Sequence, residues 1–180
     1  GKIKKVALEL ASYAKKVAAS MGTTVTAVTI NNADNSALAA YGVDKVLTVT
    51  NDKLNNFSAK AYADVIVQAA KKEGTQIVLV STSTNSLYLA PLVAVALEAG
   101  YVSNVVALPE STSPFQVKRT VFSNKAFNVT EIATPIKVLG IAKNSFGLVE
   151  SASTLAEESF APTLNDADFG IKVESVEKVS

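Results

Sequence analysis

The stretch TQIVLVSTSTNSLYLAPLVAVALEAGYVSNV, residues 75–105, decides the fold of this chain. Its apolar run at 76–80 predicts a strand buried on both faces, and the apolar residues 87–99 predict a helix. The hydroxyl and amide side chains of 81–86 lie between them and predict a loop. Open α/β sheets place ligands where a strand ends just before a helix, so this loop is the first candidate for a binding site.

Helices and strands alternate on the N-terminal side of this stretch as well. The spacing of apolar residues and the capping residues Ser58 and Gly74 give the bounds. The pattern predicts a helix over 2–21, strands over 24–30 and 45–50, a short helix over 37–41, and a helix from 58 to 74.

On the C-terminal side the pattern changes to successive strands. Strands are predicted over 102–108, 116–122, 126–132 and 136–141, then a polar, loop-like stretch over 143–168, and a last strand over 169–176. Alternating α and β elements followed by adjacent strands indicate a mainly parallel sheet extended by antiparallel strands. We therefore expect an α/β fold with three layers, α/β/α.

The composition is that of one folded domain. The chain has 180 residues, of which 48% are hydrophobic and 18% charged, with a net charge of +1. Lysines are scattered and form no basic stripe, so we expect no nucleic-acid partner. No apolar run approaches the roughly 20 residues that cross a bilayer, so we expect no membrane insertion.

The sequence contains no His, no Cys and no Trp. Transition-metal sites normally need imidazole or thiolate ligands, so we expect no such metal site. Triads that need His, and Cys nucleophiles, are excluded, and the aspartates and glutamates form no pair suited to acid–base catalysis. We therefore expect no catalytic residue, and the sequence favours a binding or scaffold domain over an enzyme.

Four residues are candidates for contacting an anion or a partner protein. Ser83, Asn85 and Ser86 lie in the loop before the predicted helix, whose N-terminus favours anions. The loop lacks glycine, however, so a capped turn is the simpler interpretation. Arg119 is the only arginine in the sequence. Arginine suits carboxylates and phosphates, but a salt bridge or an interface contact explains Arg119 equally well.

The chain opens directly on a helix. Doubly wound domains of this type usually open on a central strand, so either the topology differs or a first strand is missing. We interpret residues 1–180 as one domain of a longer polypeptide.

Five motifs, in order, resemble the alpha subunit of the electron transfer flavoprotein. They cover nearly the whole chain, and their order and spacing carry more weight than any one of them. They are the GKxKKxxxE pattern at 1–9, AYGVDKV at 40–46, LAP at 89–91 followed by VSNV at 102–105, the segment from Arg119 to Ala126, and NSF at 144–146.

The sequence also departs from the family pattern. Ser86, Leu87 and Tyr88 stand where the family often has a Gly, a basic residue and an Asp or Asn, and Leu92 stands in place of an Arg. Asn124-Lys125 replaces a Gly-Asn pair. The changes near the loop remove charge, which argues further against an anion site there.

The resemblance implies the N-terminal domain of that subunit, with an adenine-nucleotide-hydrolase-like fold. It places the first strand before Gly1 and the domain that holds most of the FAD after Ser180. AMP would be bound by the partner beta subunit. We therefore expect neither cofactor to be bound by residues 1–180.

The resemblance also implies partners and a place in the cell. Proteins of this family are alpha–beta heterodimers that carry electrons from acyl-CoA and other dehydrogenases to a quinone oxidoreductase of the respiratory chain. This domain would be a scaffold for the beta subunit and the flavin domain, in the bacterial cytoplasm rather than the mitochondrial matrix. The alternative is an adenine-nucleotide-binding module resembling universal stress proteins, although their glycine-rich phosphate loop is not found here.

Overall fold

The computed structural model describes residues 3–82, 84–121, 125–165 and 168. Strands and helices alternate in the first half, and strands dominate the second half. The helices are α1 (Lys5–Met21), η1 (Ser36–Ala40), η2 (Asp52–Leu54), α2 (Ala59–Glu73) and α3 (Thr84–Ala96). The strands are β1 (Thr26–Ile30), β2 (Lys45–Val49), β3 (Ile77–Ser81), β4 (Gly100–Val105), β5 (Ser111–Thr112), β6 (Phe115–Val121), β7 (Ala126–Ile132), β8 (Lys137–Ile141) and β9 (Ala156–Ser159).

Capping residues explain where the first two long helices end. Gly22 and Gly74 follow α1 and α2 with φ of 68° and 61°, a left-handed conformation that costs glycine little. At the start of α2, the Ser58 hydroxyl accepts a hydrogen bond from the backbone N–H of Ala61 at 3.4 Å. These caps agree with the bounds predicted from the sequence.

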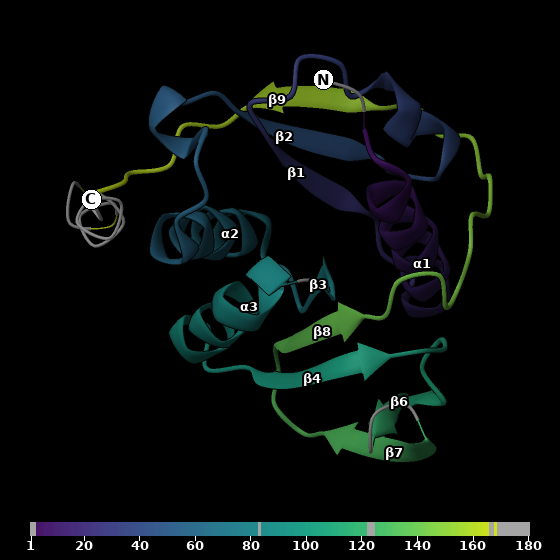
Figure 1. The fold of residues 1–180 in the computed structure, drawn as a ribbon. Helices are drawn as coiled ribbons and strands as arrows, with labels where there is room; N and C mark the ends of the chain where they lie inside the picture. Colours follow the sequence, from purple (N-terminus) through teal and green to yellow (C-terminus); the bar gives the residue numbers. More distant parts are fainter. Residues whose placement is uncertain (1–2, 83, 122–124, 166–167, 169–180) are drawn as a thin grey trace.

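The described strands form two sheets. The smaller has the order β1-β2-β9 and is entirely parallel. The larger has the order β3-β8-β4-β6-β5, with β7 paired to β6. In it β3, β8 and β4 are parallel, and β6, β7 and β5 extend the sheet in antiparallel fashion. Figure 1 shows the smaller sheet at the top, β8, β4, β6 and β7 at the bottom, and β3 between them.

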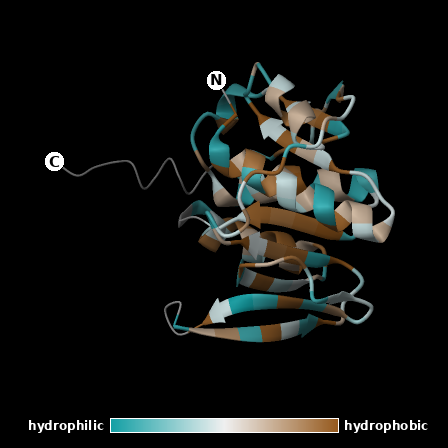
Figure 2. Ribbon diagram, turned by 90° about the vertical axis from the view of Figure 1, so that its right-hand side faces the viewer, coloured by the Kyte–Doolittle hydropathy of each residue, from teal (hydrophilic) through white to brown (hydrophobic). Residues whose placement is uncertain are grey.

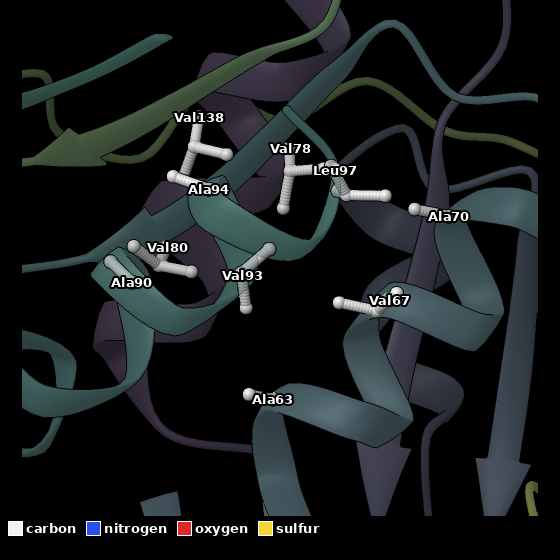
Figure 3. Packing of buried hydrophobic residues seen from close by; sticks show 10 residues of the cluster. All are labelled: Ala63, Val67, Ala70, Val78, Val80, Ala90, Val93, Ala94, Leu97 and Val138. Carbon is white, nitrogen blue, oxygen red and sulfur yellow. The ribbon is translucent and has the colours of Figure 1, made fainter. Parts of the chain in front are cut away.

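Helices cover both faces of the strands, as a three-layer fold requires. In Figure 1, β3 lies between α1 on one side and α2 and α3 on the other. Figure 3 shows the core between α2, α3, β3 and β8, where Val67, Val93 and Val80 are among the buried side chains. On the other face, Tyr13 and Val17 of α1 pack against Leu139 of β8. The predicted fold class is confirmed.

The start of α3 differs from the prediction. The helix begins at Thr84, although the sequence predicted a loop through residue 86 and a helix from Leu87. The prediction started the helix at its first apolar residue, but the first turn of a helix readily takes polar residues that favour caps. Asn85 and Ser86 therefore belong to the first turn of α3.

The strand β9 was also missed, because residues 143–168 were predicted to be loop-like. Its sequence, Ala-Glu-Glu-Ser, is polar because β9 is an edge strand with much of its surface exposed. Glu158 of β9 forms ion pairs with Lys45 of β2 at 3.4 Å and with Lys72 of α2 at 2.9 Å. The predicted strand over 169–176 lies outside the described residues.

A buried carboxylate joins α1 to the loop after β8. Oε1 of Glu9 accepts a hydrogen bond from the backbone N–H of Asn144 at 2.8 Å. Its Oε2 accepts from Phe146 at 3.2 Å and Gly147 at 2.8 Å. Three donors compensate for burying the charge of Glu9, which is 5% exposed. The hydrogen bonds of Glu9 therefore connect the first sequence motif, at 1–9, to the last motif, at 144–146.

Candidate functional site

The three candidate residues that the structure describes lie on two different elements, α3 and β6. Ser83 lies outside the described residues. Asn85 is exposed on the first turn of α3, whereas Ser86 beside it is buried. Arg119 is half-buried on β6, in the antiparallel part of the larger sheet.

A small cavity lies at the carboxyl end of β3, beside the start of α3. Its volume is about 270 Å³, at the lower limit of ordinary ligand pockets. Ser81, Asn85 and Ser86 supply polar groups to its wall, and the other lining residues are apolar or aromatic: Leu10, Phe57, Tyr62, Leu79, Val80 and Leu89. The walls hold no charged group, and the predicted contact of an anion or a partner with this loop stays a prediction.

Arg119 has a structural role that the sequence did not reveal. Its Nε donates a hydrogen bond to the backbone carbonyl of Ser103 at 3.0 Å, and its Nη2 donates to the Ser103 hydroxyl at 3.2 Å. These contacts bind β6 to β4 near the place where Arg119 pairs with Val105. Among the described residues, no salt bridge involves Arg119, so its charge is balanced by oxygen dipoles and solvent.

Arg119 of β6 and Ser103 belong to a polar cluster with Tyr101, which lies with Ser103 on β4, and Thr82, which follows β3. A Cβ placed on Gly140 of β8 would lie 3.4 Å from the Tyr101 hydroxyl and 3.5 Å from that of Thr82. The absence of a side chain at Gly140 therefore leaves room for both hydroxyls. The Thr82 hydroxyl is buried and has no hydrogen-bond partner among the described residues.

The electrostatics of this cluster centre on Tyr101. Burial raises the pKa of Tyr101, while the hydrogen bond with Ser103 and the charge of Arg119 lower it in part. Sequence reasoning missed this group, although two signals pointed to it. Tyr101 and Ser103 are two residues apart on β4, and the only arginine in the sequence lies on β6, which pairs with β4. A cation beside hydroxyl donors suits an anion or a carbonyl of a partner.

The cluster supplies neither a strong nucleophile nor a general base. Within the part of the chain that the structure describes, no group of three or more Asp, Glu, His or Cys could hold a metal ion. No described helix combines the length and apolar character needed to span a bilayer. What the cluster offers is hydrogen bonding and one positive charge.

The most exposed apolar surface lies on α3. The exposed fractions are 63% for Leu87, 64% for Tyr88, 43% for Leu92 and 78% for Val95. These positions recur at helical spacing on one side of α3, which we call the α3 face. Four large apolar side chains together on one helix face are typical of a protein–protein contact.

A second exposed apolar pair lies at the far end of the larger sheet. Phe127 and Val129 of β7 are exposed, and the Lys118 ammonium lies 4.5 Å from the centre of the Phe127 ring. In Figure 2 the hairpin of β6 and β7 alternates between hydrophobic and hydrophilic residues at the bottom of the view. This pair is smaller than the α3 face and is interspersed with polar residues. The α3 face is therefore the stronger candidate for a protein–protein contact.

Comparison with known proteins gives one family. The model of the electron transfer flavoprotein domain family matches residues 1–165. The chain is 31% identical over 111 residues to the electron transfer flavoprotein subunit alpha of Clostridium acetobutylicum, and 32% identical over 111 residues to that of Thermoanaerobacterium thermosaccharolyticum. It is 27% identical over 108 residues to the subunit alpha of Bacillus subtilis.

The alignments cover different shares of this chain and of its relatives. Each aligned stretch covers 60% of this chain, but 33%, 34% and 33% of the three relatives respectively. The chain therefore spans about a third of the length of the curated relatives that it matches.

Proposed function

Because the chain belongs to the electron transfer flavoprotein domain family, we propose that it is the N-terminal domain of an alpha subunit and serves in electron transfer. Its role there is to hold other parts of the complex in place. The order of the five sequence motifs and the three-layer fold support this assignment. The similarity to three bacterial alpha subunits supports a bacterial protein.

The α3 face is the observation that carries the proposed scaffold role. Burying Leu87, Tyr88, Leu92 and Val95 removes apolar surface from water, which stabilises a complex by about 25 cal/mol per Å². We assign this face to the partner beta subunit, because the sequence resemblance implies that this domain packs against that subunit. Asn85, at the edge of the face, and Arg119 remain candidate contacts at an interface.

The described residues do not fit a flavin dinucleotide. The cavity beside α3 is about 270 Å³ and has no charged wall, and a larger one between β1 and β3 is lined mainly by apolar side chains. A pyrophosphate is usually held by a glycine-rich turn at a helix N-terminus. In this proposal FAD therefore belongs to the domain after Ser180, AMP to the beta subunit, and no step of the redox chemistry runs through residues 1–180.

The electron donors and the electron acceptor that we propose are those that the family resemblance implies. Electrons would enter the complex from acyl-CoA and other dehydrogenases and leave to a quinone oxidoreductase. Residues 1–180 would carry no catalytic group and would act in the bacterial cytoplasm. The comparisons do not favour the alternative of a nucleotide-binding module of the universal stress type.

Binding to the beta subunit tests the scaffold role. The probe is the beta subunit of a bacterial electron transfer flavoprotein, titrated with the unmodified chain and with the double variant Leu87→Lys/Val95→Lys. We expect the double variant to bind at least about tenfold more weakly, a loss of about 1.4 kcal/mol. The matched control is Phe127→Lys/Val129→Lys, which places two charges on the exposed apolar pair of β7.

Two results would contradict the proposal. One is equal binding by the α3 double variant and the unmodified chain. The other is that the β7 control weakens binding as much as the α3 variant, which would move the interface to the hairpin. Calorimetry with ATP and AMP tests the alternative, since micromolar binding to residues 1–180 would favour a nucleotide-binding module.

A further inference from the structure

Arg119 directs one edge of its guanidinium at Ser103. Its Nε–H and one N–H of Nη2 donate to the carbonyl and the hydroxyl of Ser103, at 3.0 and 3.2 Å. The other N–H groups of the guanidinium have no acceptor among the described residues, and no described carboxylate forms an ion pair with Arg119. Because Arg119 is half-buried, solvent screens its charge less than it would on an open surface.

The Ser103 hydroxyl links Arg119 to the phenol of Tyr101. The Ser103 oxygen accepts the hydrogen bond from Nη2, so its own proton is left to donate. The Tyr101 oxygen accepts that proton, and this hydrogen bond lowers the pKa of Tyr101 against the larger effect of burial. The phenolic proton of Tyr101 is therefore not used on Ser103 and needs an acceptor of its own.

Gly140 of β8 leaves room beside the Tyr101 phenol and beside a second hydroxyl, that of Thr82. A Cβ added at Gly140 would lie 3.4 Å from the Tyr101 oxygen and 3.5 Å from the Thr82 oxygen, which are ordinary van der Waals distances. The Thr82 hydroxyl is buried and has no partner among the residues that the structure describes. Two hydroxyls that bond to each other use only one of their two protons, so the pair has one donor to spare.

The sheet holds these donors in fixed positions. Tyr101 packs against the core that Val80 and Val138 share with α3. Thr82 follows β3, and its backbone N–H still donates to the carbonyl of Ile141 of β8 at 2.9 Å. Donors that are held in place before a ligand arrives bind it at a lower cost in entropy.

Spare donors and a single positive charge together select the chemistry of a ligand. A carboxylate only accepts hydrogen bonds, carries one negative charge, and presents two oxygens that suit a guanidinium. A neutral carbonyl would leave the charge of Arg119 unpaired. A phosphate is usually held by the backbone of a glycine-rich loop as well, and residues 81–86 contain no glycine.

We propose that Arg119, Tyr101 and Thr82 form a binding site for a carboxylate group. One carboxylate oxygen accepts from the N–H groups of Arg119 that are not used on Ser103, and the other accepts from the Tyr101 hydroxyl, with the Thr82 hydroxyl beside it. The carboxylate belongs either to a small organic acid or to an Asp or Glu side chain of the beta subunit. Only the second source rests on the proposed function.

Titration with sodium acetate tests the site. Arg119 is the only arginine in the sequence, so its Nε–H gives one unambiguous signal in a nitrogen–proton NMR spectrum. We expect a saturable shift of this signal, with a Kd on the order of 10 mM. Acetamide, which has the shape of acetate without its charge, and sodium chloride at equal ionic strength are the controls and should give no saturable shift. No saturation by about 100 mM acetate, or an equal effect of acetamide, would overturn the proposal.

Two variants test where the acetate lies. Tyr101→Phe removes the phenolic hydroxyl, and Gly140→Ala places a methyl group beside both hydroxyls at distances that the fold tolerates. Each should weaken acetate binding by at least about fivefold, as followed on the same Arg119 signal. Tyr88→Phe, at an exposed position on α3, is the matched control and should leave the Kd unchanged. The same Kd in all three variants would show that acetate contacts the arginine alone, which would also overturn the proposed site.

Binding of the beta subunit distinguishes the two sources of the carboxylate. If a side chain of the beta subunit supplies it, Arg119→Gln should weaken the complex by about tenfold, and about 100 mM acetate should compete with the beta subunit. Acetate binding to the chain with an unchanged complex would assign the site to a small organic acid. A failure of the proposed function is distinguishable, because it would leave the complex insensitive to Leu87→Lys/Val95→Lys and would not alter the acetate titration of the chain alone.

Discussion

Glu9 and Gly147 are joined by a hydrogen bond of 2.8 Å from the backbone N–H of Gly147 to the Glu9 carboxylate, although 138 residues separate them in the sequence. The same carboxylate accepts two further N–H groups from Asn144 and Phe146. The Glu9 side chain is buried, although the residues that donate to it are half-buried or exposed. The contact fixes the loop after β8 to the first helix.

Glu9→Gln should therefore destabilise the fold by about 2–4 kcal/mol, because it removes the charge that three backbone donors compensate. Urea unfolding measures the loss. The control is Glu150→Gln, at an exposed position a few residues beyond the loop, which should change the free energy of unfolding by less than about 0.5 kcal/mol. Equal effects of the two substitutions would show that the hydrogen bonds of Glu9 contribute little.

Two glycines with positive φ should tolerate alanine differently. Gly74 has open space where a Cβ would stand, so Gly74→Ala should cost only the left-handed strain, about 1–2 kcal/mol. At Gly42 the new Cβ would lie 2.5 Å from Cγ of Lys15, so Gly42→Ala should cost about 2–4 kcal/mol. Thermal or urea unfolding of the two variants measures the order, and a larger loss at Gly74 would contradict the crowding by Lys15.

Tyr13→Phe should lower the free energy of unfolding by about 1–2 kcal/mol at neutral pH, because the Tyr13 hydroxyl donates to the carbonyl of Ala107 at 2.7 Å. Burial raises the pKa of Tyr13 far above its ordinary value. The contribution of the buried phenol is therefore fully present below about pH 10, where tyrosine of the unfolded chain begins to ionise, and is lost as the pH rises further.

The difference between the unmodified chain and Tyr13→Phe should accordingly narrow above about pH 10, by at most about 1.4 kcal/mol per pH unit. Urea unfolding at a series of alkaline pH values measures this slope for both proteins. A constant difference across the series would mean that Tyr13 ionises as easily in the folded state as in the unfolded state.

Arg119→Ala should raise the pKa of Tyr101 further, because the arginine charge is one of the two influences that lower it against the effect of burial. Ultraviolet absorbance of tyrosinate as a function of pH measures the change, with Tyr101→Phe identifying the signal. Lys118→Ala, which removes the neighbouring cation that lies over Phe127, is the matched control and should leave the Tyr101 titration unchanged. A shift of equal size in both variants would show that the effect is not specific to Arg119.

Elements governed by local rules could be predicted from the sequence. Ser58 and Gly74 bound α2 as expected, and the apolar run at 77–80 forms the strand β3. The family resemblance was equally visible, since it depends on motifs and their order. The predicted single domain of residues 1–180 as part of a longer polypeptide stays a prediction.

Features that depend on contacts between distant residues could not be predicted. The polarity of residues 156–159 indicated a loop, because the pairing that makes them a strand is supplied by β2 and by the lysines at 45 and 72. Arg119 was recognised as unusual, but its partner Ser103 lies on another strand. The exposed side of α3 was also missed, since an apolar helix sequence does not tell which side is left uncovered.

The pairing of β9 with β2 has a consequence for the order in which the chain can fold. The Thr48 hydroxyl donates to the Glu158 carbonyl across 110 residues of sequence, so β2 lacks this neighbour until most of the chain has been synthesised. Contacts between such distant segments slow folding, because the entropy of closing a long loop is lost before the contact forms. On the ribosome, the first half of this protein should therefore emerge with one edge of β2 unpaired, because β1 can pair only with the other edge.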